Sequence, residues 1–116
     1  MNWATLQNRY AKDDLAQRLG NLASTLGRVS QRALNVDSLQ AVPLAVRESM
    51  RMMEWNLQVA PPEVLGALAP MQAELGLWWR SWEVVAQSAT LRQLLSHRAR
   101  AMSDQVLELS GLLNQP

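Results

Sequence analysis

Residues 14–34, DLAQRLGNLASTLGRVSQRAL, indicate the fold class of this chain more clearly than any other stretch. Apolar residues recur in it at intervals that alternate between four and three: Leu15, Leu19, Leu22, Leu26, Val29 and Ala33. This spacing places the side chains in a single stripe along an α-helix, which is the pattern of a helix in a bundle. Asp14, followed three residues later by Gln17, resembles a capping pair at the start of that helix.

Small residues lie along one side of the same predicted helix. They are Ala16, Gly20, Ala23, Gly27 and Ser30. Glycine within a helix costs about 1 kcal/mol relative to alanine. Two glycines on one side therefore suggest that another helix approaches closely there. The alternative is that this side is a solvated face with no packing role.

The rest of the chain predicts three more helices, over residues 38–59, 70–87 and 91–113. Asp37 and Thr90 are the expected N-caps of the first and the last of these three. Pro43 either kinks the first turns of its helix or marks the true start. A short helical turn over residues 63–69 leads to Pro70, where the next helix is expected to begin, although a different division of the chain at Pro70 stays open.

The sequence therefore predicts an all-α fold, in which four main helices form a single up-and-down bundle with a short extra helical turn. An N-terminal arm over residues 1–13 precedes the bundle. The chain has 116 residues, which suits one domain. No stretch alternates apolar and polar residues between hairpin turns, so strands are not expected.

Composition excludes several kinds of site. The sequence has no cysteine, which rules out disulfides, thiolate metal sites and cysteine nucleophiles. Its formal net charge of +1 does not indicate binding to nucleic acid or to acidic partners. With one histidine and no inward-facing Glu-x-x-His pair, we expect no metal, cofactor or small-molecule substrate. The N-terminus lacks a signal-peptide pattern and no apolar stretch is long enough to span a membrane, so a cytoplasmic location is expected.

Three of the five tryptophans fall within residues 75–85, LGLWWRSWEVV. Trp78 and Trp82 lie in the apolar stripe of the helix over 70–87, and we expect both in the core. Trp79 lies to one side of the stripe. It is either a residue at the edge of the core or an interface anchor, since tryptophan is enriched in binding hot spots. Further apolar residues, Leu77 and Val84, lie on the other flank, so this helix is expected to be the most buried of the four.

Two further apolar faces are predicted outside the core stripes, and each is expected to be buried by a contact. The helix over 38–59 carries one of them away from its own stripe, formed by Leu44, Met52, Trp55 and Val59. The arm carries the other, formed by Trp3, Leu6 and Tyr10. Such faces are covered either by the same chain or by another, and tryptophan and methionine are typical of interfaces. We expect these residues, with Trp79, to contact a protein partner or a second copy in a homodimer.

His97 is the only histidine, and it lies opposite the stripe of its helix, so we expect it to be exposed. Residues 96–102, SHRARAM, resemble the phosphoacceptor helix of histidine phosphotransfer domains, because Arg100 places a basic residue three positions after the histidine. Ala101 stands where that motif usually has glycine. The family has two further helices after the histidine, whereas 19 residues follow His97. The resemblance implies a phosphoacceptor role for His97.

Charged residues suggest one structural contact and one further function. Glu74 and Arg98 each lie near the apolar stripe of their helix, and we expect a structural ion pair between them. The first and last helices carry several arginines, but acidic residues are interspersed with them, which is typical of a mixed solvated face. The sequence therefore predicts a non-enzymatic helical protein–protein interaction or assembly module that forms a homodimer. Phosphotransfer through His97 and nucleic-acid binding through surface arginines are the alternatives.

Overall fold

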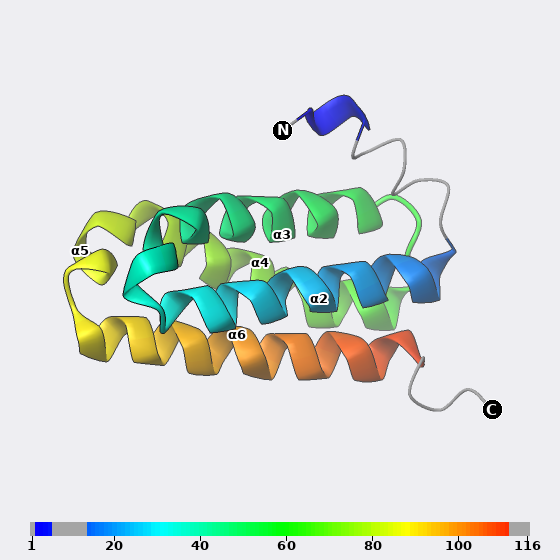
Figure 1. Ribbon diagram of the computed structural model, residues 1–116. Coiled ribbons are helices and arrows are strands. Elements are labelled where there is room, and N and C mark those ends of the chain that lie inside the picture. The colour runs from blue at the N-terminus through cyan, green and yellow to red at the C-terminus, as the bar shows by residue number, and fades with distance from the viewer. Residues whose placement is uncertain (1, 6–13, 112–116) are drawn as a thin grey trace.

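The structure is a computed structural model that describes residues 2–5 and 14–111. Five α-helices and one 3-10 helix follow a single helical turn at residues 3–5. They are α2 (Leu15–Ala33), η1 (Val36–Ala41, the 3-10 helix), α3 (Val42–Asn56), α4 (Pro62–Arg80), α5 (Trp82–Ala86) and α6 (Ala89–Ser110). The four long helices run alternately in opposite directions, with η1 and α5 at one end (Figure 1). The predicted all-α bundle is thus confirmed.

Helix α2 begins and ends close to where its sequence predicts. Asp14 is its N-cap, and the Asp14 Oδ1 atom accepts a hydrogen bond from the backbone N–H of Gln17 at 2.8 Å. This bond satisfies one of the four N–H groups that have no partner inside a helix. The cap predicted for α6 is wrong by two residues, since Ser88 rather than Thr90 accepts from the backbone N–H of Leu91, at 3.2 Å.

The segment before α3 also departs from its prediction. Residues 36–41 form the 3-10 helix, whose N-cap is Asn35 rather than Asp37. The Asn35 Oδ1 atom accepts from the backbone N–H of Asp37 at 3.0 Å. The α-helix begins only at Val42, with Pro43 in its first turn. Pro43 therefore marks the true start of this helix, where its missing N–H leaves no hydrogen bond unmade.

Helix α4 runs from Pro62 through Pro70 to Arg80, so the predicted start at Pro70 is wrong. The buried residues on the two sides of Pro70 form one stripe with the spacing four-three-four: Val64, Leu68, Met71 and Leu75. Burial of this continuous stripe outweighs the one backbone hydrogen bond that a proline removes. The chain leaves the helix instead at Ser81, after which the short α5 follows.

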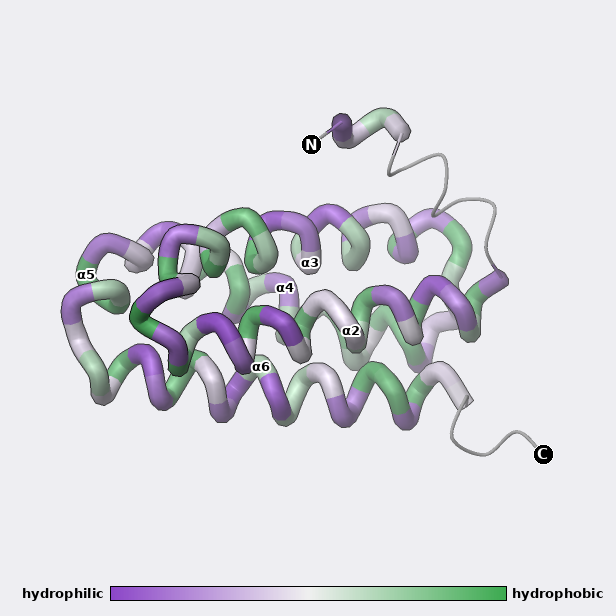
Figure 2. Tube along the Cα trace, viewed as in Figure 1, coloured by the Kyte–Doolittle hydropathy of each residue, from purple (hydrophilic) through white to green (hydrophobic). Residues whose placement is uncertain are grey.

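The core lies along α2. Its largest fully buried side chains include Leu19, Leu22 and Leu26, each with no exposed surface. Helix α4 was expected to be the most buried, but α2 buries eight residues and α4 buries five. Figure 2 shows hydrophilic and hydrophobic segments recurring along α2, α3 and α6, as in amphipathic helices that share a core.

Three of the small residues of α2 face α6, namely Ala23, Gly27 and Ser30, so a helix does approach that side closely. The Ser103 Oγ atom donates to the backbone carbonyl of Ala23 at 2.7 Å. The hydroxyls of Ser30 and Ser96 lie 3.1 Å apart. Hydroxyl groups of α6 reach the backbone and small side chains of α2 because no bulky side chain separates the two helices. Of all the helix pairs, α2 and α6 pack together most extensively.

Gly27 offers a direct test of how much room this contact leaves. A Cβ atom at Gly27 would lie 3.8 Å from the Ser103 Oγ atom, which is ordinary van der Waals contact. Gly27→Ala should therefore stabilise the protein by about 0.5–1 kcal/mol, the gain in helix propensity. Urea unfolding followed by circular dichroism measures the change. Gly66→Ala is the matched control, since a Cβ there meets nothing within 4 Å. Destabilisation by Gly27→Ala alone would contradict the contact distance.

Candidate functional site

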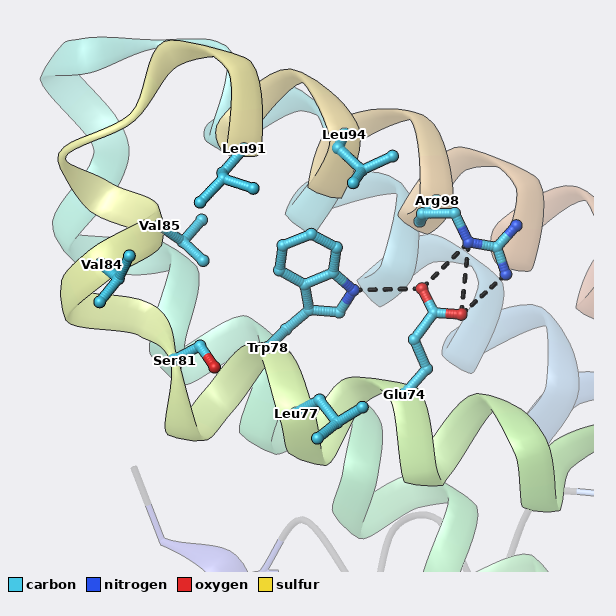
Figure 3. A pocket seen from close by; sticks show the side chains of 9 residues that line it. All are labelled: Glu74, Leu77, Trp78, Ser81, Val84, Val85, Leu91, Leu94 and Arg98. Atoms are coloured by element: carbon cyan, nitrogen blue, oxygen red, sulfur yellow. Dashed lines mark hydrogen bonds and ion pairs between the residues drawn. The ribbon is translucent and has the colours of Figure 1, made fainter.

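An open apolar groove lies where α4, α5 and α6 meet. Its main hollow has a volume of about 480 Å³. Its apolar lining comes from all three helices: Leu77, Trp78, Val84, Val85, Leu91 and Leu94 (Figure 3). Ser81, Glu74 and Arg98 complete the lining. Pockets of 300–1,000 Å³ with mostly apolar walls and few polar groups are typical binding sites.

The groove exists because α4 and α6 pack together at few positions, whereas α6 packs closely along α2. The break between α4 and α5 at Ser81 also helps to open the groove. It turns the chain so that Val85 is buried under the end of the bundle while Val84 points outward. The Arg92 guanidinium donates to the backbone carbonyl of Ala86 at 2.6 Å and thereby ties the end of α5 to α6.

Three apolar side chains on the rim of the groove are largely exposed. Leu77 on α4 is 57% exposed, Val84 on α5 is 65% exposed and Leu94 on α6 is 46% exposed. The side chain of Trp78 lies between them, half-buried against the core. An exposed apolar cluster around a hollow, with an aromatic residue inside, has the composition of a protein interface core.

One ion pair crosses the groove and joins α4 to α6 (Figure 3). Arg98 donates from Nη2 to Glu74 Oε1 at 2.8 Å and from Nε to Glu74 Oε2 at 3.0 Å. This bidentate geometry is the strongest form of an arginine–carboxylate contact. The indole N–H of Trp78 donates to Glu74 Oε2 at 3.1 Å. The predicted pair is therefore confirmed, and it also orients the indole ring that lines the groove.

The hydrogen bonds from Arg98 hold the pKa of Glu74 below its usual range, partly opposed by burial and supported by Trp78. A lowered pKa in the folded state means that Glu74 contributes stability above its unfolded pKa, which is about 4.3. That contribution is lost as the pH falls through the folded pKa. Glu74→Gln should therefore lower the melting temperature at neutral pH, and the two proteins should converge as the pH falls below the lowered pKa of Glu74 in the folded state. Thermal melts across this range measure the difference, and a constant difference would contradict it.

The groove continues beyond the ion pair. A second hollow of about 210 Å³ lies on the far side of Glu74 and Arg98. Its other lining residues are Gly66, Ala67, Pro70, Met71 and Gln105. All five of these residues are uncharged. The α4–α6 face is therefore one long groove, and the ion pair between Glu74 and Arg98 divides it into a larger apolar hollow and a smaller one.

The residues predicted to form a second apolar face on α3 do not stay together in the structure. Leu44 is 47% exposed and Val59 is 57% exposed, but Met52 is 4% exposed and belongs to the core. The expectation that Met52 faces outward is therefore wrong. Trp55 is half-buried against the core. Trp3 is half-buried in the turn at residues 3–5, and Leu6 and Tyr10 lie outside the described residues.

Polar residues explain why the buried face of α3 differs from the predicted stripe. Ser49 and Asn56 are fully buried. Each donates to a backbone carbonyl of its own helix, because Ser49 Oγ donates to the carbonyl of Ala45 at 2.9 Å and Asn56 Nδ2 donates to that of Met52 at 3.0 Å. A stripe drawn through apolar residues alone misses both positions.

Tryptophans 78, 79 and 82 all pack against the core and remain partly exposed. Trp78 and Trp82 are thus at the margin of the core, not inside it as predicted. Trp79 stacks under the guanidinium of Arg47 on α3, with 5.2 Å between the guanidinium carbon and the ring centroid. This cation–π contact between α3 and α4 supports the reading of Trp79 as a residue at the edge of the core.

His97 is exposed on α6, as expected. Within the part of the chain that the structure describes, no group of three or more histidine, aspartate or glutamate side chains is placed to hold a metal ion. Among the same residues, no helix is both long and apolar enough to cross a membrane.

Comparison with known proteins adds no relative. No family model, no curated protein sequence and no solved structure matches this chain. The sequence signal of the groove between α4, α5 and α6 is the apolar flank formed by Leu77 and Val84. Leu94 lies on another helix, so the sequence pattern of one segment does not connect it with them.

Proposed function

We propose that this chain is a non-enzymatic helical interaction module that assembles as a homodimer. The observation that supports the proposal is the open groove of about 480 Å³ between α4, α5 and α6, with Leu77, Val84 and Leu94 largely exposed on its rim. Burying such a surface is worth about 25 cal/mol per Å². A second chain that covers the groove gains this free energy at the rim without rearranging the core.

The charges around the described surface favour a protein partner over nucleic acid. Three of the described arginines pair with a carboxylate: Arg28 with Glu48 at 3.4 Å, Arg51 with Glu54 at 3.1 Å and Arg98 with Glu74 at 2.8 Å. Phosphate binding needs arginines that remain free to neutralise the backbone. The groove itself contains one acid and one base, and its other lining residues are uncharged.

A homodimer is the simplest assembly for such a module. Two-fold dimers are the commonest oligomers of soluble proteins. A bundle of this length also buries only about two-thirds of the surface of its unfolded chain, so association supplies stability that a small core lacks.

The mass in solution tests the proposal. Light scattering coupled to size exclusion, run over a wide range of concentration, should give a mass near twice the 13.0 kDa of one chain at the upper end. The mass should fall towards that of one chain on dilution. A single-chain mass at every concentration would overturn the homodimer. The groove would then require a different protein as its partner.

A further inference from the structure

The α4–α6 face brings together two hollows, exposed apolar side chains and a balanced charge pair. The hollow on the α3 side of α4 is smaller, about 200 Å³, and its lining is mainly charged: Arg47, Arg51 and Glu54 beside Met50 and Trp79. Leu44 lies in the first turn of α3, whereas Val59 lies beyond the end of that helix at Asn56. Neither residue lines one of the three hollows described above.

The α4–α6 face is also large enough for a stable contact. At about 1.5 Å per residue, the 19 residues of α4 span about 28 Å, and two adjacent helices of about 10 Å diameter give a face about 20 Å wide. This face projects an area of roughly 560 Å² before the relief of the side chains is included. A standard interface hides about 800 Å² on each partner, which is of the same order.

The face offers both a hollow and projecting apolar side chains. It presents a hollow whose floor is Trp78 and Val85, and beside the hollow it presents the exposed side chains of Leu77, Val84 and Leu94. A two-fold axis brings the same patch of both copies together. The exposed side chains of one copy then meet the hollows of the other, and each copy supplies both halves of the contact.

The charges of the face are self-complementary. Two copies of a wholly basic or wholly acidic face would repel each other, whereas this face contains Glu74 and Arg98 side by side. Arg98 uses Nε and Nη2 on Glu74 of its own chain. Among the described residues Arg98 Nη1 makes no hydrogen bond, and Figure 3 shows this nitrogen turned away from Glu74. It remains as a donor for a carboxylate of a facing chain.

We propose that the second copy docks on this groove, so that two α4–α6 faces meet about a two-fold axis and Glu74 of each copy pairs with Arg98 of the other. This inference rests on the proposed homodimer and names its surface. The rim residues Leu77, Val84 and Leu94 enter the facing groove, and the charge pairs set the register of the two copies.

Leu77→Glu and Val59→Glu locate the interface, because both positions are 57% exposed and lie on different surfaces. Each variant is first checked for unchanged helicity by circular dichroism. Leu77→Glu should then weaken the dimer at least tenfold, while Val59→Glu leaves it within twofold. A dimer that survives Leu77→Glu but is disrupted by Val59→Glu overturns this surface while the homodimer itself stands. A monomeric parent protein overturns the homodimer, and this inference falls with it.

Charge reversal tests the pairing between copies. Glu74→Arg gives a groove with two positive groups, and Arg98→Glu gives one with two negative groups, so each variant alone should associate at least tenfold more weakly than the parent. An equimolar mixture should restore association to within a few-fold, because opposite faces then meet. Mixing protein with different tags and capturing one tag counts the mixed pairs. A mixture that associates no better than the separate variants overturns the face-to-face pairing.

Discussion

Leu26→Ala should destabilise the protein by about 3 kcal/mol or more. Leu26 lies in the middle of α2 and has no exposed surface. Replacing a fully buried leucine with alanine removes its transfer free energy and leaves a cavity, and the two together cost about 2–5 kcal/mol. α2 is the helix against which α3 and α6 pack, so the walls of this cavity belong to several helices and cannot all move inward. Urea unfolding followed by circular dichroism measures the loss.

The control for this prediction is Leu34→Ala. Leu34 follows the end of the same helix and is 61% exposed. Its removal should change the free energy of unfolding by less than about 0.5 kcal/mol, as surface substitutions usually do. Similar losses for the two variants would mean that α2 is not the centre of the core.

Ser103→Leu should destabilise the protein by about 2–4 kcal/mol. Ser103 is 7% exposed and faces Ala23 and Gly27 across the contact between α2 and α6. A larger side chain must push the two helices apart, which costs about 1–3 kcal/mol. The hydrogen bond to the carbonyl of Ala23 is also lost, at about 1 kcal/mol. Urea unfolding again supplies the measurement.

Ser103→Ala separates the two contributions, since it removes the hydroxyl without adding volume. It should cost about 1 kcal/mol, the hydrogen bond alone. The difference between the two variants then reports how closely α2 and α6 approach. If leucine proves no worse than alanine at this position, the small residues of α2 do not serve a close contact.

Prediction from the sequence worked best where one helix carries its own signals. The stripe from Leu15 to Ala33 and the cap at Asp14 predicted α2 to within a residue at each end. These signals are local, because a helix closes its hydrogen bonds within itself and its caps lie next to it. The pairing of Glu74 with Arg98 was also predictable, because each lies at the margin of an apolar stripe that must face the core.

Prediction failed where residues far apart in the chain compete for the same space. Pro70 is a strong local signal for a helix start, yet the core contacts of Leu68 and Met71 carry α4 through it. Met52 appeared to face outward, yet it lies in the core and its sulfur accepts a hydrogen bond from the hydroxyl of Thr25 at 3.7 Å. The rotation of α3 that buries Met52 depends on α2, which the sequence of α3 does not contain.

The sequence by itself determined that this chain is a bundle of amphipathic helices and which side of α2 receives a close neighbour. Periodicity and small side chains act within one helix, so both can be found in a single segment. Only the tertiary structure decided that the apolar surface in excess gathers in a groove on α4, α5 and α6. The width of that groove depends on how far α4 stands from α6. That distance is set by the close packing of α6 on α2 and by the turn at Ser81. The packing joins segments far apart in the chain, so the distance is fixed only once the helices have packed.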